Sequence, residues 1–220
     1  MEAWHSSFKQ NHRIIKKLII LSFIIISQAV FGQDCLNVQF KLRGYFYAGS
    51  SQMDSTALGG FYEDSNSPKK LTSEIAKLSA PDKLQIVVIP EMTTEFAEGI
   101  SGFKVFVINT SDSIQKLPAQ DSRLYLKRQV FYKNQWRDIE YLPSSWCGNS
   151  YHSVFIKPNE YWDFTAPCLV GKIESKFRFE LYVNDKMTVY SNVFNGSFNE
   201  KQLVKAQGYS PAGIMDPYEN

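Results

Sequence analysis

A long apolar run is the first thing that this sequence lacks. The longest run, Leu18–Phe31, has 14 residues, whereas a membrane-spanning helix needs about 20. Four basic residues precede it, and Val30 and Gly32 occupy the third and first positions before a plausible cut ahead of Gln33. This order of basic flank, short apolar run and small residues predicts a cleaved secretory signal peptide over residues 1–32, and no membrane span after cleavage.

A strong net charge is also lacking once that segment is set aside. The whole chain has 24 basic and 22 acidic residues, and residues 1–32 carry four of the basic ones and one of the acidic ones. The remainder has 20 basic and 21 acidic residues, a net charge of −1. Nucleic acid is therefore not an expected partner, because a basic patch or stripe is the electrostatic footprint of such proteins.

Histidine is scarce. His5 and His12 lie in the signal segment, so His152 is the one histidine of the exported chain. Blue-copper sites need two histidines with a cysteine, and a cysteine nucleophile such as Cys147 needs a nearby base and a lowered pKa. We therefore expect no catalytic, metal or cofactor site at Cys147 and His152, and we interpret the protein as non-enzymatic.

Cysteine is also scarce, with Cys35, Cys147 and Cys168 as the three positions. Export places them in an oxidising compartment, secreted or periplasmic, where disulfides persist. Cys35 lies just after the expected cut, but Asp34 precedes it where a lipid-attachment signal has a small residue. A lipid anchor at Cys35 is therefore not expected.

The pattern around Cys147 and Cys168 predicts a disulfide between them. Tyr151–Ile156 and Tyr161–Ala166 are strand-like, and the intervening Lys157–Glu160 contains the Pro-Asn pair typical of a tight turn. If the two strands formed an antiparallel hairpin, the two cysteines would lie opposite each other, within the roughly 4.4–6.8 Å between Cα atoms that a disulfide requires.

Helical periodicity is nearly absent from the exported chain. One short helix is expected around Leu71–Leu78, and most other segments alternate apolar and polar residues with a period of two, as half-buried strands do. The expected strands are 36–47, 84–89, 103–109, 123–132, 136–142, 151–156, 161–166, 175–183 and 187–198. Strands at this spacing with so little helix predict an antiparallel sandwich or barrel.

Two motifs resemble a known architecture. The apolar strand Phe103–Ser111, which ends in Asn-Thr-Ser, and the turn Lys157–Glu160 are similar to immunoglobulin-like and fibronectin-type-III-like modules of secreted bacterial proteins. The resemblance implies an all-β, immunoglobulin-like antiparallel β-sandwich and no particular activity. We assign the sandwich to residues 84–199, an N-terminal extra strand, mobile long loop and short helix to 33–83, and a tail to 200–220.

Aromatic residues are abundant, at 15% of the chain. The candidate binding residues cluster within 27 positions and are Trp136, Trp146, Tyr151, His152, Tyr161 and Trp162. Exposed on one face, they could stack on sugar rings or anchor a protein; buried, they would fill the core. The exposure of the three tryptophans distinguishes these interpretations.

Four functions remain open. The leading hypothesis is a secreted, non-enzymatic β-sandwich that acts by binding or by structural contact in the cell envelope, with an unknown protein or glycan as partner. A carbohydrate-binding module that uses exposed aromatic residues is the main alternative. A hydrolase lacks an evident acid–base set, and a protease inhibitor would need a rigid exposed loop.

Overall fold

The computed structural model describes residues 34–59, 66–145 and 147–207. The expected signal peptide, Trp146 and the tail from residue 208 lie outside these described residues. The strands are β1 (Leu42–Arg43), β2 (Lys69–Lys70), β3 (Leu84–Ala97), β4 (Ile100–Asn109), β5 (Gln115–Gln120), β6 (Arg123–Leu124), β7 (Leu126–Tyr132), β8 (Gln135–Asp138), β9 (Glu140–Tyr141), β10 (Tyr151–Ile156), β11 (Glu160–Pro167), β12 (Ile173–Asn184), β13 (Met187–Tyr190) and β14 (Phe194–Phe198). The helix α2 (Ser73–Ala76) and the 3-10 helices Gly148–Ser150 and Glu200–Leu203 are short.

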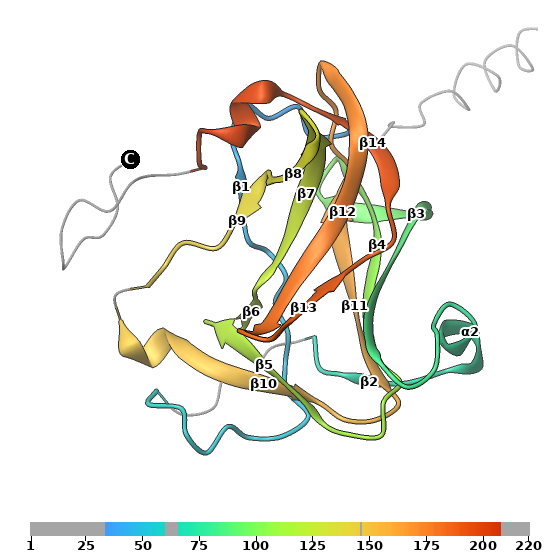
Figure 1. The fold of residues 1–220 in the computed structure, drawn as a ribbon, viewed down its shortest axis with the longest axis vertical. Coiled ribbons are helices and arrows are strands. Elements are labelled where there is room, and N and C mark those ends of the chain that lie inside the picture. The colour runs from blue at the N-terminus through green and yellow to red at the C-terminus, as the bar shows by residue number, and fades with distance from the viewer. Residues whose placement is uncertain (1–33, 60–65, 146, 208–220) are drawn as a thin grey trace, which may run out of the picture. The chain divides into compact units, whose positions relative to one another are not determined.

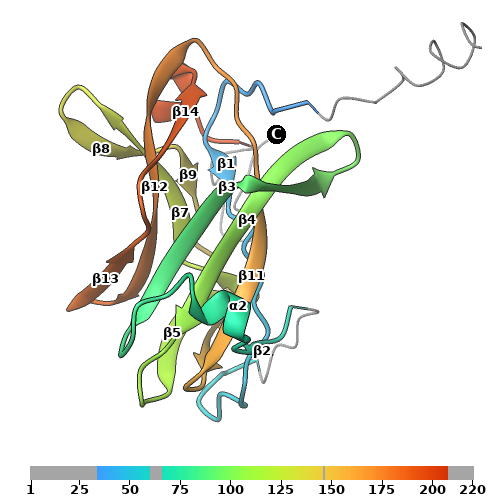
Figure 2. The same ribbon diagram turned by 90° about the vertical axis from the view of Figure 1, so that its right-hand side faces the viewer.

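The prediction of an all-β antiparallel sandwich is confirmed. One sheet has the order β2-β11-β4-β3, and the facing sheet has the order β13-β12-β7-β8, with β14 beside β13 along the same edge of β12. Figures 1 and 2 show these two layers from the front and from the side. A third sheet, β10-β5-β6, lies at one end, and β1 pairs in parallel with β9.

Alternating apolar residues build the core between the two layers. On β12, Phe177, Phe179, Leu181 and Val183 are buried, whereas the residues between them face outward. β4 is buried on both faces, as its continuous apolar run predicts. Trp162 on β11 is wholly buried and donates a hydrogen bond from Nε1 to the Gly49 carbonyl at 2.9 Å. That bond satisfies the polar edge of a ring that otherwise packs among apolar side chains.

The N-terminal segment takes part in this core but forms little strand. Only Leu42–Arg43 forms a ladder, and the rest of the expected strand 36–47 makes single bridges to separate segments. Phe46 is 1% exposed and its ring meets Phe164 of one sheet and Phe179 of the other, at centroid distances of 5.4 and 5.5 Å. The segment therefore crosses between the layers instead of lengthening one of them.

The loop that follows is held against β10. Ser51 donates its backbone N–H to Phe155, and Asp54 accepts the backbone N–H of Ser153 at 2.7 Å. The described part of the expected mobile loop is thus fixed by hydrogen bonds, and residues 60–65 lie outside the description. The short helix is confirmed as α2, capped by the Thr72 hydroxyl.

Several expected boundaries differ in the structure. Pro90 does not end its strand: β3 continues to Ala97. The register between β3 and β4 shifts between Ile89 and Thr93. A bulge tolerates proline because the ladder needs no N–H there. The expected loop 110–122 contains β5, and the expected last strand is interrupted between β13 and β14.

The interruption between β13 and β14 caps the edge of β3. The Asn192 side chain accepts the backbone N–H of Val88 at 2.8 Å and donates to the Val88 carbonyl at 2.9 Å. A side-chain amide here replaces the peptide group of a neighbouring strand. No helix among the described residues is long and apolar enough to cross a membrane.

Candidate functional site

The disulfide joins Cys35 to Cys168, so the predicted Cys147–Cys168 bond is wrong. The Cα atoms of Cys35 and Cys168 are 4.7 Å apart across a sequence separation of 133, and Cys147 is a free, exposed thiol. The prediction failed because the expected hairpin does not form. β10 pairs with β5 and β11 pairs with β4, so the turn between them carries the chain from one sheet to another.

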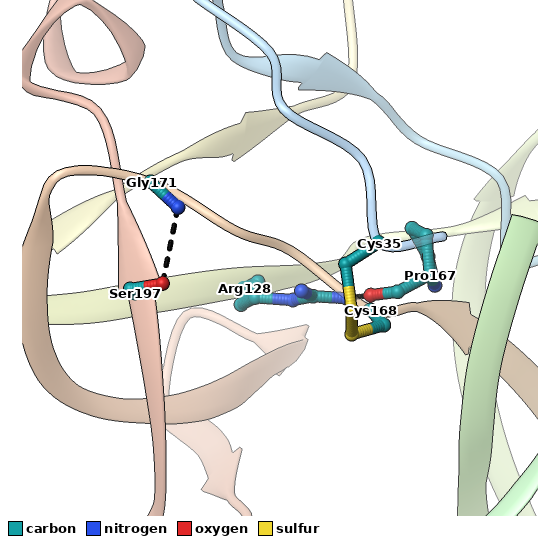
Figure 3. Close-up of a disulfide and its surroundings, with 6 residues drawn as sticks. All are labelled: Cys35, Arg128, Pro167, Cys168, Gly171 and Ser197. Atoms are coloured by element: carbon teal, nitrogen blue, oxygen red, sulfur yellow. Dashed lines mark hydrogen bonds between the residues drawn. A yellow bond between two sulfur atoms is a disulfide. The ribbon is translucent and has the colours of Figure 1, made fainter. Parts of the chain in front are cut away.

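Arg128 lies beside this disulfide (Figure 3). It is the centre of a buried ionic network. Arg128 and Glu140 are each 1% exposed, and Arg128 Nε lies 3.2 Å from Glu140 Oε1. Arg128 Nη2 donates to the Pro167 carbonyl at 2.9 Å and to the Tyr45 hydroxyl at 3.1 Å, and Tyr45 donates to Glu140 at 2.7 Å. Both charges are therefore paired, as burial requires, although Arg128 Nε is buried without a hydrogen bond.

Burial also shifts the proton affinities in this network. Desolvation raises the pKa of Glu140, opposed by the Arg128 charge and by the hydrogen bond from Tyr45. The pKa of Tyr45 is raised as well, mainly by desolvation. Because Glu140 has Arg128 and two hydrogen-bond donors at its oxygens, including the Arg128 backbone N–H at 2.8 Å, we treat it as the counter-ion of Arg128 at neutral pH.

The predicted aromatic residues do not share one face. Trp136 is half-buried on the outer face of β8, and Trp162 lies in the core. Tyr161, on β11 in the opposite sheet, packs against Phe106 of β4. Of the three tryptophans used as the sequence test, one is partly exposed and one is buried, and Trp146 lies outside the described residues. The cluster in sequence is therefore dispersed by the strand pairing.

Tyr151 and His152 lie on β10, in the third sheet. Tyr151 is 38% exposed, and its hydroxyl donates to the Ser145 carbonyl at 2.7 Å. His152 is 7% exposed, with Nδ1 3.2 Å from the Ser150 carbonyl. Burial lowers the pKa of His152, despite the nearby Asp54 and Asp121 carboxylates. The packing of His152 fits a role in positioning the loop before β10.

A different set of aromatic residues forms an outward surface on the five-stranded sheet, which we call the aromatic face. Strand alternation places outward-facing residues of β8, β7, β12 and β13 in adjacent rows, with Phe131 opposite Trp136 and Glu180 between Lys127 and Tyr190. The aromatic face consists of Tyr125, Phe131, Trp136, Arg178, Tyr182 and Tyr190.

Arg178 is the centre of the aromatic face. Its guanidinium carbon lies 4.3 Å from the centroid of the Trp136 ring and 3.8 Å from that of Tyr190. Arg178 Nε also donates to the Gln129 side chain at 2.8 Å. Phe131 meets Trp136 edge to face at 5.4 Å. Cation–π contacts and the hydrogen bond therefore hold these long side chains against one another.

A row of charged side chains, formed by Lys127, Asp138 and Glu180, continues the aromatic face along the sheet. Lys127 Nζ lies 2.7 Å from Asp138 and 3.1 Å from Glu180. Although burial lowers the pKa of Lys127, the two carboxylates outweigh it and hold that pKa above its usual value. Lys127 thus stays a cation, and the row adds both signs of charge to the surface.

Two hollows lie along this face. One of about 810 Å³ is open to solvent and lined by Phe131, Trp136, Ser175, Lys176 and neighbouring residues. The second, of about 430 Å³, includes Lys127, Tyr125 and Tyr182. Across the described ranges, no three histidine, cysteine, aspartate or glutamate side chains are grouped to hold a metal ion.

Sequence reasoning missed most of this face, although a signal for it existed. If 175–183 is a half-buried strand, its alternation places Arg178 and Tyr182 on the solvent-facing side. The alternation of 123–132 likewise places Phe131 on the solvent-facing side of that strand. Exposed aromatic residues at outward positions of successive strands mark such a surface. The order of the strands, which brings Tyr190 next to Arg178, was not available from the pattern.

Comparison of the chain with protein-family models, with curated proteins and with solved structures gives no match. The immunoglobulin-like resemblance therefore stays a prediction beyond the sandwich itself, and the function has to be argued from the geometry of the aromatic face.

Proposed function

We propose that the protein is an exported, non-enzymatic, immunoglobulin-like β-sandwich that binds a protein partner through the aromatic face. The observation that carries this proposal is the Trp136–Arg178–Tyr190 stack. Tryptophan, tyrosine and arginine are the residue types that dominate binding energy in protein interfaces. Their ordering by one another reduces the conformational entropy that binding would otherwise cost.

The layout of the face also suits a protein partner. A stable interface covers about 800 Å² on each partner, which requires an extended surface. The two hollows lie along the same sheet face, and the charged row that contains Lys127 lies between the aromatic residues of one hollow and those of the other. Aromatic anchors surrounded by paired charges match an interface in which charge sets orientation and aromatic rings supply contact.

A carbohydrate is the second candidate, and the larger hollow favours it specifically. There the Phe131 and Trp136 rings lie beside the polar side chains of Ser175 and Asn195. Rings next to hydroxyl and amide groups can stack on a sugar and hydrogen-bond its hydroxyls. This alternative uses one end of the face and predicts little dependence on Tyr182 at the other end.

Site-specific photo-crosslinking tests the proposal. A photoreactive residue at Thr188, exposed beside Tyr190, is expected to form a protein adduct in the native envelope or culture medium, and Trp136→Ala or Arg178→Ala in the same chain should reduce it at least tenfold. The matched control is Tyr161→Ala, on the opposite sheet, which should leave the adduct unchanged.

Two results would count against a protein partner. Equal adducts from Thr188 with and without Trp136→Ala would show that the stack does not bind. Binding of purified protein to a glycan array that depends on Trp136 but not on Tyr182 would assign the face to carbohydrate instead.

A further inference from the structure

A third, smaller cavity lies between the two sheets and shares Asn195 with the larger hollow of the aromatic face. It measures about 190 Å³ and receives residues from both layers and from the segment after β11. Phe103, Phe177 and Phe194 supply much of its wall, with Phe194 5.4 Å from Phe103 and 5.7 Å from Phe177 between ring centroids. Gly196 is required here, since a Cβ would lie 2.6 Å from the Phe177 ring.

Arg128 is the single ionisable residue among those that line the cavity. Its Nε is paired with Glu140 and its Nη2 donates to Tyr45 and Pro167. Among the described residues, no hydrogen bond or ion pair involves Nη1. Nε is buried without a hydrogen bond, whereas Nη1 is not among the buried atoms that lack one, so Nη1 is the donor of this 1% exposed side chain that the cavity can reach. A ligand oxygen in the cavity would give Nη1 a hydrogen-bond acceptor that the described residues do not supply.

The charge balance decides which acceptor fits. Glu140 already compensates Arg128, and no other ionisable side chain lines the cavity. A carboxylate ligand would therefore add a second buried anion to a single buried cation, and desolvation of an unpaired ion is strongly unfavourable. An uncharged carbonyl oxygen can accept from Nη1 without that penalty.

We propose that this cavity binds an uncharged ligand group that has a small apolar body and one carbonyl oxygen, with Arg128 as the donor to that oxygen. The volume is consistent with a six-membered ring and a short polar head, since an apolar cavity of about 150 Å³ accepts benzene. Thr93 and Asn195, both exposed lining residues from the edges of the two sheets, mark the entrance.

Three probes of the same size test the head group: benzamide, benzoate and toluene. Each is titrated into the purified, disulfide-bonded protein, and binding is followed by calorimetry and by the NMR signals of the Arg128 side-chain N–H groups. Benzamide is expected to bind at least tenfold more tightly than benzoate or toluene and to shift the Arg128 signals.

Two variants locate the site without removing Arg128. Thr93→Trp should fill the entrance and abolish benzamide binding, while Thr188→Trp, exposed on β13, should leave it unchanged. A third variant, Arg128→Met combined with Glu140→Gln, removes both charges together and should make benzamide and toluene bind equally.

The outcomes are decisive in both directions. Loss of binding in Thr93→Trp, with retention in Thr188→Trp, supports the cavity as the site. Benzoate that binds as tightly as benzamide, or no binding of any probe up to its solubility limit, overturns the proposal.

Discussion

At the scale of single residues, Asp54 shows how one buried carboxylate fixes a loop. It is 6% exposed, and it accepts hydrogen bonds from the Thr56 hydroxyl, the Thr56 backbone and the Ser153 backbone. Burial alone would raise the pKa of Asp54, but these hydrogen bonds outweigh it and lower that pKa to about 2. The charged form is therefore stabilised specifically in the folded state.

Replacing Asp54 with alanine is expected to lower the free energy of unfolding by about 1–3 kcal/mol, because backbone N–H groups of Thr56 and Ser153 lose their acceptor. The folded-state pKa lies below the unfolded value of about 3.9, so the contribution is complete above about pH 4 and disappears as the pH falls towards 2. Urea unfolding between pH 7 and 2 checks this. Ser55→Ala, at an exposed neighbour, should show no such pH-dependent loss, and a constant Asp54→Ala deficit down to pH 2 would contradict the assignment.

At the scale of the elements, the disulfide attaches the segment before β1 to the end of β11. Closing a loop of about 134 residues stabilises a fold by about 5 kcal/mol on the chain-entropy model. Cys35→Ser should therefore lower the free energy of unfolding by several kcal/mol, whereas Cys147→Ser should leave it nearly unchanged. Denatured, unreduced protein should contain one free thiol, and peptide mapping should place it at Cys147. A linked Cys147–Cys168 peptide, or equal destabilisation by both variants, would refute this connection.

The elements also show which information the sequence carries. The alternation of β12 and the two-faced burial of β4 could be predicted, since each depends on the residues of one strand. β5 was missed because it contains Pro118, which disfavours a strand, and because its buried positions hold only two apolar side chains, Leu117 and Ala119. The turn Lys157–Glu160 was correctly located, but a turn reverses the chain without determining which strand lies beside the next. Pairing is decided by packing across the core, and the disulfide and the aromatic face both depend on pairing.

At the scale of the whole molecule, the described residues 34–59 and 66–83 are part of the main core. These described residues form no core of their own, and Phe46 and Ala48 are buried among residues of both sheets. A chain that begins at Leu84 is therefore expected to lack a cooperative thermal transition, as measured by circular dichroism. In the intact chain, Phe46→Ala should cost about 3–5 kcal/mol, while Met53→Ala, at a side chain that is 68% exposed, should cost less than about 0.5 kcal/mol. A stable, cooperative 84–207 fragment would show that the sandwich is autonomous.

The side-chain amide of Asn192 affects the tendency of the protein to aggregate through the edge of β3. An edge strand with free N–H and C=O groups recruits strands from other molecules and starts aggregation. By occupying both backbone groups of Val88, the Asn192 side chain removes that attachment point from the most apolar part of β3. This edge of the sandwich therefore offers one attachment point fewer for sheet-to-sheet polymerisation.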